Sequence, residues 1–73
     1  MNKIFISTEY IKLGQFLKFS GIVFTGSECK MFIDKNSVKI NGNEIKQRGK
    51  KLFPGDLIEI NKEKFLIERK NDN

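Results

Sequence analysis

Hydrophobic and polar positions change their spacing along this chain, and each spacing predicts a different element. The stretch 3–7 (KIFIS) is short and rich in β-branched and aromatic side chains, which predicts an opening strand. Leu13, Phe16 and Leu17 then follow the i, i+3, i+4 spacing of one buried helix face, and a Ser-Gly pair ends this helix. The apolar residues 22–24 (IVF) that come next are expected to be tucked between helices, because three such side chains are costly to leave in water.

A second helix is predicted from its start signal. Residues 25–28 (TGSE) match a capping box, in which the threonine hydroxyl accepts from the glutamate backbone N–H and the glutamate carboxylate reaches back. The apolar stripe of this helix is Cys29, Phe32 and Ile33. Asn36 suits the left-handed conformation that often follows a last helical turn.

A hairpin is predicted after the second helix. Residues 38–40 (VKI) alternate between inward and outward positions, and the Asn-Gly pair at 41–42 favours a type I′ turn because both turn positions need positive φ. Residues 44–46 form the expected returning arm. The Pro-Gly pair at 54–55 then predicts a second turn.

Two further strands are predicted at 57–60 and 64–68, joined by the polar residues 61–63. The order of elements indicates a small α+β domain, in which two short helices pack on one face of a mostly antiparallel sheet. A chain of 73 residues supports one core, so residues 1–73 are expected to form a single domain. Residues 71–73 (NDN) are expected to be a frayed tail.

The net charge of +5 is unevenly distributed along the chain. Residues 25–51 carry seven basic and three acidic side chains, whereas residues 52–73 carry four basic and five acidic ones. A localised basic surface on a small domain suits a polyanion such as nucleic acid.

Composition also argues against a membrane protein or a secreted one. No apolar run approaches the roughly 20 residues that span a bilayer. The N-terminus lacks the long apolar core of a signal peptide. We therefore expect a cytoplasmic protein with no membrane partner.

Motif spacing argues against an enzyme. The chain has no histidine, and its single cysteine, Cys29, falls on a predicted buried stripe, where a packing role is the better explanation than a nucleophilic one. No two acidic residues are spaced as an acid/base pair, and the glycines do not match the known phosphate-binding loops. We expect no catalytic residue, no metal and no cofactor.

Basic residues are the strongest candidates for a functional site. The stretch 46–51 (KQRGKK), here called the basic loop, holds four positive charges, and residues 45–55 contain no acidic side chain. Gly49 in its middle lets the backbone come close to a phosphate. A single surface lysine usually serves only to keep a protein dissolved, so it is the concentration of charge that favours a contact with phosphate.

Four segments together resemble the S-four RNA-binding domain, a module named after the fourth protein of the small ribosomal subunit. They are residues 13–18 (LGQFLK), 25–33 (TGSECKMFI), 38–42 (VKING) and 48–56 (RGKKLFPGD). Their order and spacing match the family over about residues 11–60. They are similar to the segments of short stand-alone bacterial members of the YaaA type.

The resemblance implies an L-shaped surface, made by two helices and the hairpin, that grips structured RNA. The implied partner is ribosomal RNA or transfer RNA, with the large ribosomal subunit as the place of action, and we expect a monomer. Carried over position by position, the family motif puts RNA contacts at Lys12, Gln15, Lys18, Thr25, Ser27, Lys30 and Lys39, and the basic loop adds Lys46, Arg48, Lys50 and Lys51.

The chain departs from the family pattern at three positions. Many members have an arginine where this chain has Lys12 and Gly26, and a glycine is common where it has Asn36. A lysine binds phosphate without the two-pronged fork of arginine, and a glycine carries no charge at all.

Binding of this kind is expected to be salt-dependent and selective for shape. Most phenylalanines are expected in the core and Tyr10 is the only tyrosine, which leaves few aromatic side chains to stack on bases. Two other functions stay open, a small protein-interaction adaptor and an accessory RNA-binding subunit of an RNA-modifying enzyme. Purification with and without ribonuclease would separate protein partners from RNA partners.

Overall fold

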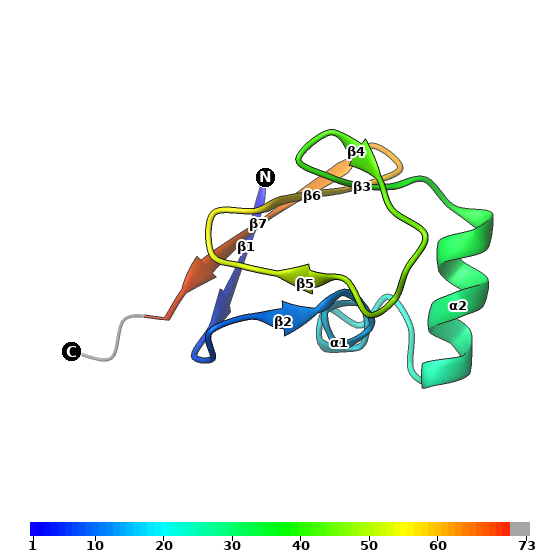
Figure 1. Ribbon diagram of the computed structural model, residues 1–73, viewed down its shortest axis with the longest axis horizontal. Coiled ribbons are helices and arrows are strands. Elements are labelled where there is room, and N and C mark those ends of the chain that lie inside the picture. Colours follow the sequence, from blue (N-terminus) through cyan, green and yellow to red (C-terminus); the bar gives the residue numbers. More distant parts are fainter. Residues whose placement is uncertain (71–73) are drawn as a thin grey trace.

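A five-stranded sheet forms one layer of the computed structural model (Figure 1). Its strands lie in the order β1-β7-β6-β3-β4, with bounds Asn2–Ile6, Glu63–Arg69, Leu57–Ile60, Val38–Ile40 and Asn43–Glu44. β1 pairs with β7 in parallel, and the other neighbours are antiparallel. The structure describes residues 1–70, so the tail expected at 71–73 lies outside the described residues.

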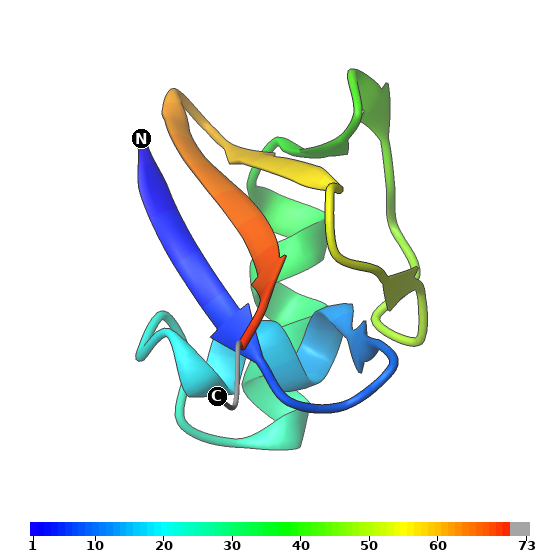
Figure 2. The same ribbon diagram turned by 90° about the vertical axis from the view of Figure 1, so that its left-hand side faces the viewer.

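Two helices, α1 (Leu13–Phe19) and α2 (Gly26–Lys35), lie on the same side of this sheet, behind the strands in Figure 2. The predicted α+β class is therefore confirmed. The ring of Phe16 meets that of Phe65 edge-on at 5.3 Å between centroids, which joins α1 to strand β7 of the sheet. The fully or nearly buried core residues are Ile6, Leu13, Phe16, Leu17, Val23, Cys29, Ile33, Val38, Ile40, Leu52, Ile58, Ile60, Phe65 and Ile67.

A second, smaller sheet was not predicted. β2 (Ile11–Lys12) pairs antiparallel with β5 (Lys51–Leu52) and lies next to the start of α1. Leu52 in this sheet is completely buried. The small sheet therefore fixes the end of the basic loop against the segment that leads into α1.

The predicted start of α2 is confirmed, with one change in its hydrogen bonds. The Glu28 backbone N–H donates to the Thr25 hydroxyl at 3.3 Å, as the capping box requires. The Glu28 carboxylate accepts from the same hydroxyl at 3.0 Å, instead of returning to a backbone N–H. The helix begins where the sequence indicated.

The predicted hairpin turn is also confirmed. Asn41 and Gly42 have φ of 52° and 86°, which is the pair of positive values that a type I′ turn needs. The returning arm is displaced, because β4 covers Asn43–Glu44 and the chain leaves the sheet before the expected residues 45–46. Val38 and Ile40 are buried and Lys39 is exposed, as the alternation predicted.

Two local predictions were wrong. Asn36 is extended, with φ −125° and ψ 159°, because its side chain closes the helix instead by donating to the Phe32 carbonyl at 2.9 Å. In the connector between the helices only Val23 is buried, Ile22 is half-buried, and Phe24 is 81% exposed. Across residues 1–70 the helices are too short and too polar to cross a bilayer.

Candidate RNA interface

The basic loop is held against the start of α1 by its own backbone. The first backbone N–H groups of a helix have no partner within the helix. Here the N–H of Leu13 donates to the Lys50 carbonyl and the N–H of Gly14 donates to the Arg48 carbonyl, both at 2.8 Å. The loop therefore caps α1, and its side chains are placed around the beginning of that helix.

Arg48 also links the basic loop to α2. Its guanidinium donates to the Gly26 carbonyl at 3.1 Å, and a Cβ added at Gly26 would lie 3.9 Å from the same nitrogen. The basic loop thus brings a guanidinium next to Gly26, where the sequence itself carries no charge.

A groove opens where α1, the start of α2 and the basic loop meet. It has a volume of about 240 Å³ and is called the basic groove. The residues that line it are Lys12, Gly14, Gln15, Lys18, Gly26, Cys29, Arg48 and Gly49. The lining includes three cationic side chains and no acidic one, which is the electrostatic pattern that attracts a phosphate backbone. The structure thus brings together Lys12, Gln15, Lys18 and Arg48 from the predicted set.

Three more predicted residues lie at the first turns of α2. The Thr25 hydroxyl is occupied by its contacts with Glu28 and with the Ser27 hydroxyl, which lies 3.2 Å away. Lys30 is exposed and follows Gly26 by four positions, so it lies on the same side of the helix as the mouth of the groove. Thr25 is primarily a capping residue, whereas Lys30 extends the positive surface.

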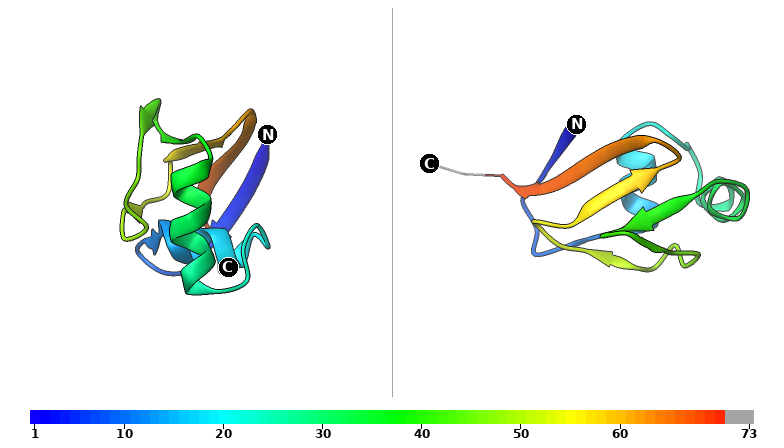
Figure 3. Two further views of the ribbon diagram at one scale, coloured as in Figure 1. Left: turned by 90° about the vertical axis from the view of Figure 1, so that its right-hand side faces the viewer. Right: turned by 90° about the horizontal axis from the view of Figure 1, so that it is seen from above.

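Lys46 lies apart from the groove, at the other end of α2. Its Nζ donates to the Ile33 carbonyl at 3.0 Å and lies 3.7 Å from a Glu44 carboxylate oxygen. Figure 3 (left) shows the chain running beside α2 from this end down toward the end where the helix starts. Lys46 and Arg48 therefore attach the basic loop to opposite ends of one helix, and the charge of Lys46 already has partners within the chain.

The last two lysines of the basic loop differ in their surroundings. The Lys51 Nζ lies 4.7 Å above the centroid of the Tyr10 ring, and Phe53 packs against Tyr10 with 5.7 Å between centroids. Within residues 1–70 the Lys50 side chain makes no hydrogen bond or ion pair, although its backbone carbonyl caps α1. Lys50 is therefore free to contact phosphate.

Lys39 is not brought to the groove. It lies on β3 directly opposite Glu44 on one neighbouring strand and Glu59 on the other. Val38 and Ile40 are buried on the face of the sheet that packs against the helices, so the Lys39 side chain lies on the opposite, exposed face. Two acidic residues are therefore its cross-strand neighbours on that face.

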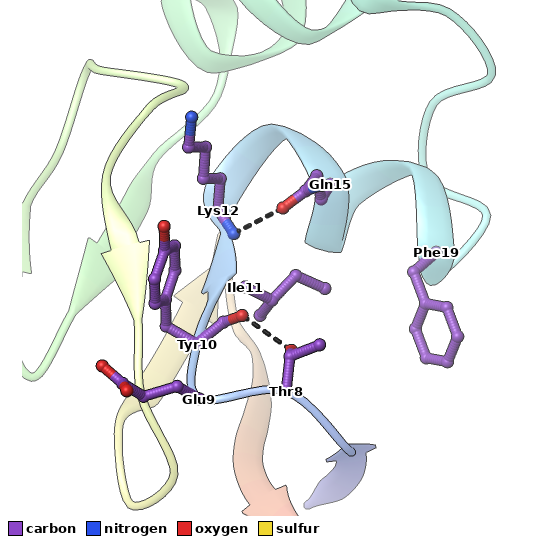
Figure 4. Close-up of a pocket in the computed structure, with 7 residues that line it drawn as sticks. All are labelled: Thr8, Glu9, Tyr10, Ile11, Lys12, Gln15 and Phe19. Carbon is purple, nitrogen blue, oxygen red and sulfur yellow. Dashed lines mark hydrogen bonds between the residues drawn. The ribbon is translucent and has the colours of Figure 1, made fainter.

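Exposed aromatic side chains were missed by the sequence reasoning. Of the seven phenylalanines, only Phe16 and Phe65 are buried, whereas Phe19 is 66% exposed. Phe19 does not fall on the stripe of Leu13, Phe16 and Leu17, so the helix periodicity contained the signal for its exposure. Phe19 lines a hollow of about 700 Å³ next to the basic groove (Figure 4).

Comparison with known proteins places the chain in a family. A family model described as S4 domain matches residues 4–68. The chain is 42% identical over 59 residues to a protein of Bacillus subtilis (strain 168) named "Probable ribosome maturation protein RlbA". That match covers 81% of this chain and 83% of the relative. The segments quoted from the sequence thus indicated the correct family, and the chain belongs to the S4 domain family.

Proposed function

We propose that this chain is a non-catalytic RNA-binding protein that grips structured ribosomal RNA during ribosome maturation. The observation that carries the proposal is the basic groove, in which Lys12, Lys18 and Arg48 converge without an acidic neighbour in the lining. The named relative supports the ribosomal context, and family resemblance supports RNA as the ligand. We propose large-subunit RNA as the first target to test, with transfer RNA as the comparison.

Binding in this proposal begins with phosphates. Each lysine or arginine that neutralises a phosphate releases counterions, so the logarithm of the affinity falls linearly with the logarithm of the salt concentration. Arg48 is held by the Gly26 carbonyl, which orients its guanidinium before RNA arrives. A side chain that is already oriented loses less conformational freedom on binding. The L-shaped junction of the two helices and the loop then selects RNA by shape.

The proposal is tested by titrating labelled fragments of large-subunit RNA, small-subunit RNA and transfer RNA at several salt concentrations. The groove variant is Lys12→Gln/Lys18→Gln/Arg48→Gln. The matched control, Lys3→Gln/Lys62→Gln/Lys64→Gln, removes the same charge from exposed positions on β1 and the β6–β7 hairpin. The groove variant is expected to lower the salt slope by about two to three units, and the control by clearly less.

Two results would contradict the proposal. Equal slopes for the groove variant and the control would show that the groove does not contact phosphate. Absence of binding to every RNA by the wild-type chain would remove the function itself. Purification of the wild-type chain with and without ribonuclease then distinguishes the adaptor alternative, because protein partners survive the digestion.

A further inference from the structure

The hollow beside the basic groove differs from it in chemistry. It is lined by Thr8, Glu9, Tyr10, Ile11, Lys12, Gln15 and Phe19. One acidic and one basic side chain make this lining neutral overall, and aromatic and aliphatic groups supply much of its surface. Its volume of about 700 Å³ falls within the range of roughly 300–1,000 Å³ that holds small organic ligands in proteins. A neutral, aromatic hollow suits a nucleobase better than a phosphate.

The geometry of the hollow provides two apolar walls. In Figure 4 Ile11 and Thr8 lie on one side and the ring of Phe19 lies on the other, while the Glu9 carboxylate points away from that ring. A second, smaller hollow shares Thr8, Ile11 and Phe19 with the first. Phe19 is 66% exposed at the end of α1, so most of its ring is available to a ligand.

Polar groups at the edge of the hollow can meet a base edge. The Gln15 side-chain oxygen accepts from the Lys12 backbone N–H at 3.0 Å, which fixes the orientation of the amide. The Gln15 Nε2 makes no hydrogen bond within residues 1–70 and is free to donate. The Thr8 hydroxyl donates to the Tyr10 carbonyl at 2.8 Å, and its oxygen keeps the capacity to accept. Every base presents both acceptors and donors on its edges, so these groups favour an exposed base without selecting one type.

The hollow and the basic groove share part of their lining. Lys12 and Gln15 line both, so a phosphate held at Lys12 would place the adjoining nucleotide at the entrance of the hollow. A base in a duplex is stacked and cannot enter, whereas a bulged or looped base can leave its stack and pack against an aromatic side chain. Recognition of such a base would be a third source of selectivity, besides the RNA shape and the phosphate charge that the sequence analysis predicted.

We propose that this hollow binds one unpaired nucleobase of the RNA, stacked on Phe19, next to a backbone held in the basic groove. The inference rests on the proposed RNA-binding function and makes it more specific. The preferred site is an RNA helix with a bulged or looped nucleotide. The main competing occupant is a side chain of a partner protein.

The test uses a labelled RNA hairpin with one bulged nucleotide and the same hairpin with an abasic residue at the bulge. Phe19→Leu keeps an apolar side chain but removes the stacking ring. The matched control is Phe24→Leu, because Phe24 is exposed but does not line the hollow. We expect Phe19→Leu to weaken binding of the bulged hairpin roughly 5- to 150-fold, the range of one base–aromatic stack, with an unchanged salt slope.

The abasic hairpin makes the test specific. Replacing the bulged nucleotide by an abasic residue should weaken binding of the wild type as much as Phe19→Leu weakens binding of the bulged hairpin. For the Phe19→Leu variant, the same replacement should cause little further loss of affinity. The inference would be overturned if the affinity losses from Phe19→Leu and from the abasic residue were additive. It would also be overturned if the wild type bound the two hairpins equally well. Neither result would contradict the salt-dependent binding of RNA. If the affinity losses caused by Phe24→Leu and by the abasic residue were non-additive instead, the base would lie near the start of α2. That result would also overturn the inference.

Two remaining outcomes concern the wild-type chain and its partners. Absence of binding to any ribosomal RNA would defeat the proposed function and this inference together. Unchanged RNA affinity in Phe19→Leu, combined with the loss of a protein that survives ribonuclease, would assign the hollow to a protein partner and overturn the base site.

Discussion

The side chains of Asn41 and Asp56 bind one another at the two ends of the segment 42–55, which contains the basic loop. The Asn41 Nδ2 donates to one Asp56 carboxylate oxygen at 3.0 Å, and the Asn41 side-chain oxygen accepts from the Leu57 N–H at 2.9 Å. The other Asp56 oxygen accepts from the Phe53 N–H at 2.8 Å. The Asn-Gly turn and the Pro-Gly-Asp turn are therefore one structural unit in this chain.

Substitutions in this unit are expected to destabilise the fold and loosen the basic loop. Asp56→Ala removes two accepting oxygens, which should lower the free energy of unfolding by about 1–2 kcal/mol, because each such hydrogen bond is worth about 1 kcal/mol net. Asn41→Gly should cost about as much, since glycine keeps the positive φ but also loses two side-chain hydrogen bonds. Urea unfolding measures both. A loss for Asp56→Ala no larger than that of an exposed loop substitution would contradict the role of this pair.

Lys46 and Lys50 are expected to give opposite results, although both belong to the basic loop. Lys46→Gln removes the Nζ donor to the Ile33 carbonyl and should cost about 0.5–1 kcal/mol of stability, because a cation near a helix C-terminus stabilises it by this order. Its effect on the salt slope should be small. Urea unfolding and RNA titration on the same preparation provide the two readings.

Lys50→Gln should leave stability unchanged and reduce the slope of log affinity against log salt by nearly one unit, as expected for one lost phosphate contact. The two variants carry the same change of charge, so each is the control for the other. Equal effects of both variants on the salt slope would show that position within the loop is unimportant.

Local patterns made the helices and the hairpin turn predictable. The stripe of Leu13, Phe16 and Leu17 depends only on the periodicity of a helix, and the Asn41-Gly42 pair depends only on backbone conformations within the turn. Such signals do not need knowledge of distant residues. The order of these elements along the chain then indicated the α+β class, and the resemblance indicated the family.

The contacts of the basic loop were not predictable from the sequence in the same way. The short pairing of β2 with β5 joins residues far apart in the chain and has no periodicity of its own. The anchors of Lys46 and Arg48 are backbone carbonyls, which every residue carries, so no side-chain pattern indicates them. Charge counting therefore gave equal weight to lysines whose surroundings in the structure differ.

Lys39 is expected to contribute little to RNA binding, contrary to what the family motif suggested. It lies opposite Glu44 and Glu59 and does not line the basic groove, and exposed charges that make no direct contact are weakened by salt screening. Lys39→Ala should therefore change RNA affinity by less than about twofold. Stability should fall by about 0.5 kcal/mol, because two carboxylates lose the cation between them. A loss of affinity as large as that of Lys50→Gln would place RNA on this face of the sheet.

Gly14 controls how closely the basic loop approaches α1. A Cβ at this position would lie 3.4 Å from the Arg48 carbonyl oxygen and 3.7 Å from the Cys29 sulfur, so one methyl group just fits. Gly14→Ala should keep RNA affinity and gain up to about 1 kcal/mol of stability, because alanine favours a helix more than glycine does. Gly14→Val places a second layer of atoms in the same space and should push the Arg48 backbone away from the Gly14 N–H.

The valine variant should then bind RNA roughly 5- to 10-fold more weakly, which corresponds to the loss of one charged contact of about 1–1.4 kcal/mol. Combining it with Arg48→Gln separates a displaced loop from a general loss of stability. If valine acts by moving Arg48, the double variant should bind as weakly as the more impaired single variant, since neighbouring substitutions that remove the same contact do not add. Fully additive losses would show that Gly14 affects binding by a route that does not involve Arg48.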